Sequence, residues 1–422
     1  MKIYRTNSVF VPGGLPDVTY IPRSERYLED RLKRAQDNLC KLITLTGPTK
    51  CGKTVLTSRV YPRDEVLWLD GGSYTDETSF WSDINEQLDV FPITQKSTIS
   101  RSQSEISGNI KGEGSIVVLK AKGDVGARQS WERGNDISRS RESNPKTTAI
   151  ASLREKKVPI IIDDFHYLPR DVQAAVIRGL KALIFEGLPA IILAIPHRRY
   201  DAVRVEREMT GRIENVQVPT WELSELNEIA QVGFPLLNIN VPKKIKDRFS
   251  SEALGSPHLM QEFCREFCRE LRVDETKIPS KDITKDMLQD KLFKKVAFGT
   301  GRMMFDKLKR GPRQRSDRKA RALKDGTATD IYGIVLHGLA SARPSIQTMT
   351  YEEIRSAIRD ISRDIPQAHE VSRVLEHMAK ISADDEASTP VIDWDKEERL
   401  LHITDPFFAY YLRWGETDTT NR

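Results

Sequence analysis

The eight residues Gly47-Pro48-Thr49-Lys50-Cys51-Gly52-Lys53-Thr54 constrain this chain more than any other feature. They match the pattern G-x-x-x-x-G-K-[ST], and they lie between an apolar run and a helix-compatible stretch. Glycines in such a loop let backbone N–H groups turn inward around phosphates, and the start of the helix adds a positive dipole. Lys53 then reaches the terminal phosphates, and the Thr54 hydroxyl ligates magnesium. The motif predicts a nucleotide site for ATP and Mg²⁺.

A second apolar run, 159–162, ends in two carboxylates, Asp163 and Asp164. A nucleotide-binding loop requires a metal-organising acid at the end of a nearby strand. We expect Asp163 to hold magnesium through water and Asp164 to orient or deprotonate the attacking water. The alternative is a strand that ends in a solvated Asp pair. Because many ATP-hydrolysing proteins carry Glu at the second position, the shorter Asp164 predicts slow turnover.

Strand-like runs alternate with stretches long enough for helices. Strands are expected at 42–45, 66–69, 159–162, 190–195 and 216–218, and helices at 79–88, 171–185 and 202–209. This alternation predicts an α/β fold, a P-loop NTPase domain over 1–221 whose parallel sheet is flanked by helices. The segment from about 95 to 148 is rich in Ser, Gly and Arg, and it predicts a β-hairpin insertion with flexible flanks.

The C-terminal half of the chain reads as helical. Apolar spacings of three and four predict a helical lid at 222–300, and a basic linker with a winged-helix domain follows at 301–422. From Arg302 to Lys324, ten Lys or Arg residues stand against two acids. This basic strip is either a solvated linker or a surface that contacts a phosphate backbone. The winged helix is predicted from helices at 330–342, 350–361 and 368–382, a hairpin turning at 395–398, and a closing helix at 405–414.

Composition excludes several protein classes. The 422 residues are 38% hydrophobic and 30% charged, which is too apolar for general disorder. No run approaches the roughly 18 apolar residues of a membrane span, so no membrane partner is expected. No export signal is recognised near the start, which favours a cytoplasmic location. The net charge of +5 permits a nucleic-acid partner without requiring one.

The order of these motifs resembles that of AAA+ ATPases, especially the origin-recognition branch and the related STAND signalling ATPases. The resemblance implies that the chain binds ATP with Mg²⁺ and assembles with copies of itself. It also implies that His197, after the strand at 190–195, senses the γ-phosphate, and that Arg212 is an arginine finger acting on a neighbouring subunit. From the residues alone, His197 can equally be a loop histidine, and Arg212 a surface arginine.

Two further segments carry the resemblance. Gly255-Ser256-Pro257-His258 is similar to the G-x-P motif of the family's lid, where the origin-recognition branch commonly has an arginine next. His258 departs from that pattern and favours the STAND-like variant, in which the lid proline and its neighbour contact nucleotide. Tyr20-Ile21-Pro22-Arg23 resembles the segment that covers the adenine, which makes Arg23 a candidate ligand. The alternative for Arg23 is an ordinary N-terminal helix cap.

Two functions from different classes follow. The first is a slowly hydrolysing ATP switch, a prokaryotic regulatory or anti-phage defence ATPase that assembles with itself or with an effector protein. The alternative is a DNA-binding ATPase, an initiator or transposition regulator, that uses the winged helix and the basic strip. A metabolic P-loop kinase is disfavoured because such enzymes rarely carry a lid and a winged helix.

Overall fold

The computed structural model describes residues 2–37, 40–90, 95–97, 139–141, 144–194, 211–283, 289–312, 318–344, 348–383 and 390–415. The predicted hairpin strands within 98–138 and the predicted helix at 202–209 lie outside these residues. Within the described ranges, none of the helices combines the length and apolarity needed to cross a bilayer.

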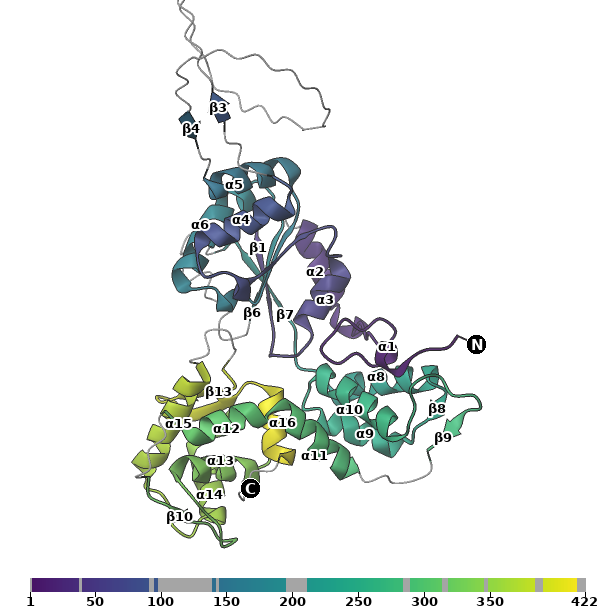
Figure 1. The fold of residues 1–422 in the computed structure, drawn as a ribbon, viewed down its shortest axis with the longest axis vertical. Coiled ribbons are helices and arrows are strands. Elements are labelled where there is room, and N and C mark those ends of the chain that lie inside the picture. Colours follow the sequence, from purple (N-terminus) through teal and green to yellow (C-terminus); the bar gives the residue numbers. More distant parts are fainter. Residues whose placement is uncertain are drawn as a thin grey trace, which may run out of the picture.

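A parallel five-stranded sheet confirms the predicted fold class (Figure 1). Its order is β2-β5-β6-β1-β7, and every neighbouring pair is parallel. The strands are β1 (Leu42–Thr46), β2 (Leu67–Asp70), β5 (Ile160–Asp163), β6 (Ala190–Ala194) and β7 (Ile213–Gln217). The strand predicted at 216–218 begins earlier, because Ile213 already pairs with Leu42.

Helices cover both faces of the sheet. On one face, α2 (Leu28–Asp37) and α3 (Lys53–Val60) pack against Ile43, Ile161 and Ile191. On the other face lie α4 (Glu77–Gln87), α5 (Pro145–Lys156) and α6 (Arg170–Phe185). The central strands β1, β5 and β6 are buried along their whole length, as expected for a sheet covered on both sides.

The predicted insertion is shorter than its expected range. β3 (Gln95–Ser97) pairs antiparallel with β4 (Arg139–Arg141), and the two project away from the sheet (Figure 1). Residues 145–148 belong to α5 instead, because the Asn144 side chain caps that helix and Pro145 occupies its first turn.

The lid consists of α8 (Leu223–Leu236), α9 (Lys243–Glu252), α10 (Pro257–Glu270) and α11 (Gln289–Thr300), with the short strands β8 (Ile239–Asn240) and β9 (Lys281–Asp282). The N-terminal segment, expected to belong to the NTPase domain, packs into this lid through α1 (Thr6–Val9) and the residue that follows it. Phe10 meets Phe234 edge-on at a centroid distance of 5.2 Å. Gly233 permits this approach, since a Cβ there would lie 2.3 Å from the Phe10 ring.

The C-terminal module contains α12 (Arg302–Arg310), α13 (Ile331–Ser341), α14 (Tyr351–Ile361), α15 (Ala368–Ala383) and α16 (Pro406–Trp414). A three-stranded antiparallel sheet has the order β12-β14-β13, from strands Thr348–Thr350, Leu400–Ile403 and Ile392–Asp395. A further two-stranded sheet pairs β10 (Arg321–Ala322) with β11 (Ala328–Thr329). The predicted hairpin turn lies where expected, because Asp395 accepts hydrogen bonds from the backbone of Glu397 and Glu398.

Two boundaries in this half differ from the prediction. The strip that begins at Arg302 is not a linker over its first part: α12 buries Phe305 and Leu308. The lid and the C-terminal module also share one hydrophobic core. The Phe293 ring of α11 lies 5.1 Å from the Phe263 ring of α10 and 5.0 Å from the Trp414 ring of α16, measured between ring centroids. Amphipathic periodicity marks a buried face but does not identify the helix that covers it.

Candidate nucleotide site

The phosphate-binding loop follows β1 and leads directly into α3, as predicted. Two residues of the loop have left-handed backbones, Lys50 with φ 62° and Gly52 with φ 94°. Lys53 begins the helix, and its ammonium donates to the carbonyl oxygens of Gly47 (2.9 Å) and Pro48 (3.0 Å). The charge is therefore held inside the curve of the loop, where a bound phosphate group would meet it.

The end of β5 supplies the predicted acids. The Thr54 hydroxyl donates to Asp163 Oδ2 at 3.0 Å, and the backbone N–H of Asp164 donates to Asp163 Oδ1 at 3.0 Å. Burial, followed by the charge of Asp164, raises the pKa of Asp163 to about 6. Hydroxyl and carboxylate oxygens are the ligands that Mg²⁺ prefers, and a cation would offset the cost of burying this carboxylate. The donor set therefore fits magnesium.

Asp164 lies where β5 gives way to a short 3₁₀ turn (Phe165–Tyr167), and its backbone is left-handed with φ 49°. Burial raises the pKa of its carboxyl, and the positive charge of Lys53 opposes this rise. Asp70, which sequence reasoning missed, pairs in register with Asp163 and also raises the Asp164 pKa. The signal was available, since parallel strands that end in carboxylates place them at one edge of the sheet.

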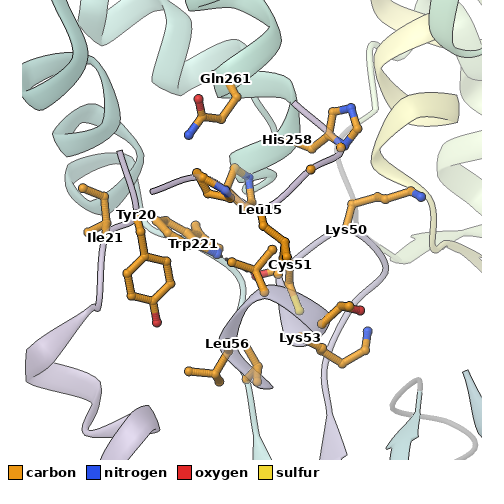
Figure 2. Close-up of a pocket in the computed structure, with 18 of the residues that line it drawn as sticks. Leu15, Tyr20, Ile21, Lys50, Cys51, Lys53, Leu56, Trp221, His258 and Gln261 are labelled. Atoms are coloured by element: carbon orange, nitrogen blue, oxygen red, sulfur yellow. Dashed lines mark hydrogen bonds between the residues drawn. The ribbon is translucent and has the colours of Figure 1, made fainter. Parts of the chain in front are cut away.

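A cavity of ≈ 570 Å³ opens beside the phosphate loop (Figure 2). Its walls come from the N-terminal segment, the loop and the lid, and they include the predicted Arg23, Pro257 and His258. Tyr20 and Ile21, from the segment expected to cover the adenine, also line it, and wall residues that the sequence did not reveal include Leu15, Trp221 and Gln261. The Trp221 indole donates to the Cys51 carbonyl at 2.8 Å, which joins the start of the lid to the loop.

Arg23 lines this cavity, and its charge is already paired with a carboxylate of the lid. It is buried, its guanidinium pairs with Glu225 at 2.9 Å, and it donates to the carbonyls of Pro219 and Thr220. The same group lies over the Trp221 ring at 4.8 Å. We call this set the Arg23 clamp. It connects the N-terminal segment to the beginning of α8, which neither interpretation of the sequence anticipated. Arg23 also stands at the N-cap position of the 3₁₀ turn Ser24–Arg26, as the alternative expected.

His258 lines the cavity from the side of the lid. Burial, with the charges of Lys50 and Arg265, lowers its pKa to about 4, so the ring is neutral near pH 7. It meets Phe407 of α16 edge-on at 4.8 Å. The lid therefore offers an uncharged imidazole at this position. Cys51 is also buried, and burial raises the pKa of its thiol.

The two other predicted residues do not complete the site within this chain. His197 lies outside the described residues. Arg212 immediately precedes β7, whereas the phosphate loop follows the far end of the parallel neighbouring strand β1. A strand of five residues separates these two ends by about 17 Å. Its guanidinium lies over the Phe185 ring at 5.0 Å. Arg212 cannot reach the loop of its own chain from this position.

No protein-family model and no curated protein matches this sequence. Among solved structures, Cdc6p from Pyrobaculum aerophilum shares 12% identity over 96% of each chain, with a TM-score of 0.44. The Walker-type ATPase paby2304 of Pyrococcus abyssi shares 16% identity over 92% of this chain and 95% of its own, with a TM-score of 0.49. The STAND protein PH0952 from Pyrococcus horikoshii, which has a tetratricopeptide repeat sensor, shares 12% identity over 93% of this chain and 42% of its own, at 0.35. At these identities the likeness assigns no role to any residue.

Proposed function

We propose that this chain binds ATP with Mg²⁺ and hydrolyses it slowly, and that it acts as an AAA+/STAND-like molecular switch. The observation that carries the proposal is that Lys53, Thr54 and Asp164 line one cavity, while Asp163 is hydrogen-bonded to both Thr54 and Asp164. A P-loop cation, a hydroxyl and a strand-end acid are the groups that ATP hydrolysis requires.

Each of these side chains has a defined task. Lys53 binds the β- and γ-phosphates, while Thr54 and Asp163 hold the magnesium ion, which supplies positive charge against the phosphate oxygens when bound. Asp164 orients a water for attack on the γ-phosphorus and accepts its proton as the bond to ADP breaks. The side chain of Asp164 is one methylene shorter than that of Glu and reaches less far toward the water, which supports slow turnover.

The test is ATP binding by calorimetry in the presence of Mg²⁺. Lys53→Ala removes the ammonium and should weaken ATP binding at least about a hundredfold, because several charge-assisted hydrogen bonds are lost. Lys41→Ala is the matched control. Lys41 lies next to the opposite end of β1 and contacts Glu214 at 3.8 Å, so its loss should leave the affinity unchanged. Equal ATP affinity in Lys53→Ala and the wild type would refute the proposal.

For the biological setting, we propose a regulatory or anti-phage defence switch that assembles with itself or with an effector protein. The shared core of the lid and the C-terminal module supports a switch, because nucleotide contacts made by the lid would reach the C-terminal surface through packed side chains. Arg212, exposed far from its own loop, supports assembly in which it meets the nucleotide of a neighbouring subunit.

A second candidate, a DNA-binding ATPase, is favoured by a cationic surface between α12 and α15. The helices and the three-stranded sheet of the C-terminal module have the order of a winged helix, in which α15 would be the recognition helix. Two adjoining cavities, of ≈ 780 Å³ and ≈ 610 Å³, share Pro312 and His377. The cations that line them include Lys307, Arg310, Arg373 and Lys380.

The acids on α15 cancel only part of this charge, because one of them pairs with an arginine that lines neither cavity. Glu370 pairs with Arg321 at 2.5 Å, and Glu376 pairs with Lys380 at 3.1 Å. Replacing Arg310 and Arg373 with Ser should lower the log–log salt slope of duplex DNA binding by about 2, since each phosphate contact contributes about 0.9. No salt-dependent binding by the wild type would eliminate this candidate without touching ATP binding.

A further inference from the structure

Lys50 of the phosphate loop extends toward the C-terminal module. Figure 2 shows its side chain leaving the loop toward the pale C-terminal ribbon, apart from Lys53. Its ammonium lies 5.6 Å from the centre of the Phe407 ring, which belongs to α16. Within the described part of the chain, the ammonium makes no hydrogen bond or ion pair. The side chain is exposed, and its left-handed backbone is one that a residue with a Cβ adopts at a cost.

The position of Lys50 joins three distant segments. The Phe407 ring contacts both the Lys50 ammonium and, edge-on, the imidazole ring of the lid residue His258. Asp405 caps α16 by accepting from the Phe408 backbone N–H at 2.8 Å. Burial raises the pKa of the Asp405 carboxyl, and the charge of Lys50 opposes that rise. The loop cation is thus part of the electrostatic environment at the start of α16.

Lys50 is also the least committed cation on the walls of the nucleotide cavity. Of the Lys and Arg residues among the described wall residues, Arg23 is engaged in its clamp, and Arg63 lies over the Trp68 ring at 4.3 Å. Lys53 is bonded to the loop carbonyls, and the lid histidine is neutral. A weak cation–π contact with Phe407 and the charge of Asp405 hold Lys50 in its present place.

We propose that Lys50 is a second phosphate-binding cation, and that it exchanges its contact with Phe407 at the start of α16 for the terminal phosphate of ATP. The inference rests on the proposed ATP site. A charge-assisted hydrogen bond to phosphate is stronger than a cation–π contact at an exposed position, so ATP wins the competition. Binding of ATP then releases α16 from the phosphate loop, and by linkage the α16 contact weakens ATP binding.

The experiment compares ATP and ADP affinities, each with Mg²⁺, in the wild type and four variants by calorimetry. Lys50→Met removes the charge and keeps the length, and it should weaken ATP about tenfold more than ADP. Phe407→Leu removes the ring and keeps an apolar side chain, and it should tighten ATP about two- to fivefold, the worth of the lost contact. In the double variant, Phe407→Leu should have no further effect. Lys50→Gly should match Lys50→Met, which excludes backbone strain as the cause.

A second readout is hydrogen exchange of the α16 backbone. ATP, but not ADP, should speed exchange at the start of α16 in the wild type, and Lys50→Met should abolish this difference. An unchanged ATP-to-ADP preference in Lys50→Met overturns the inference, as does a Phe407→Leu effect that persists in the double variant. If the wild type binds neither nucleotide, the proposed function itself has failed. If it binds both and the variants match it, only the role of Lys50 is wrong.

Discussion

Arg23 was predicted to be a nucleotide ligand, but the structure shows it bonded in the Arg23 clamp. Replacing Arg23 with Met distinguishes a role in binding nucleotide from a role in stabilising the fold. Met keeps most of the buried aliphatic stem but removes the guanidinium. The substitution deletes the ion pair with Glu225, the hydrogen bonds to the carbonyls of Pro219 and Thr220, and the contact with the Trp221 ring. We expect Arg23→Met to destabilise the nucleotide-free protein.

The magnitude follows from the burial of the two partners. Removing one member of a buried ion pair costs about 3–5 kcal/mol, because the other charge is left uncompensated. Here the side chain of Glu225 is 13% exposed and keeps a second partner, Arg26, at 3.1 Å. The expected loss is therefore lower, about 2–3 kcal/mol. Arg26→Met is the matched control: its side chain is 35% exposed, so losing its ion pair with the same carboxylate should lower stability less than Arg23→Met does.

Urea unfolding followed by circular dichroism measures these losses, with ATP affinity measured on the folded proteins. Burial alone would raise the pKa of Glu225, but its hydrogen bonds, first of all from Arg23, hold it below the ordinary 4.5. The stabilisation is therefore present above pH 4.5 and is lost as the pH falls through the folded pKa, and Arg23→Met should show a smaller acid loss. A variant with wild-type stability and tenfold weaker ATP binding would show that Arg23 is a ligand.

Three further outcomes are expected. Asp164→Asn should retain ATP binding while hydrolysis, measured by phosphate release, falls about a hundredfold, because the general base is gone; equal turnover would remove Asp164 from the mechanism. Gly233→Ala should lower urea stability by about 1–3 kcal/mol, since its Cβ would meet Phe10, and a stabilised variant would contradict that packing. In the presence of a non-hydrolysable ATP analogue, the wild type should self-associate and Arg212→Ala should stay monomeric, as measured by molecular mass; a wild type that stays monomeric would leave Arg212 with a structural role.

Local chemistry made the centre of the site predictable from sequence. The glycine spacing of 47–54 and the carboxylates after 159–162 each specify a backbone geometry within a few residues. Alternating strands and helices then fix which ends of the strands meet, so Thr54 and Asp163 are found in contact. The same reasoning applied to the strand at 66–69 would have found Asp70, whose carboxylate lies just beyond that predicted strand.

The walls of the cavity could not be predicted in this way. Leu15, Trp221 and Gln261 have no motif, and only tertiary packing brings them together. Arg23 was recognised by its sequence neighbours, but the partner that engages it, Glu225, lies in a different module. Likewise, the helical periodicity of 222–300 gave the lid but not its shared core with α16, because a hydrophobic face does not specify its partner.

The hydrophobic core shared by the lid and the C-terminal module determines which helices move together when nucleotide binds. α10 begins at Pro257 on the cavity wall, and further along it Phe263 packs against Phe293 of α11 and Tyr410 of α16. Close-packed side chains of this kind do not deform continuously, so a displacement of α10 carries α11 and α16 with it. The contact between Lys50 and Phe407 joins this body to the phosphate loop at a second point, beside His258. Releasing that contact leaves the body connected through the Arg23 clamp and the hydrogen bond from Trp221 to Cys51, and free to turn about them. We therefore expect ATP to move the C-terminal surface as a unit.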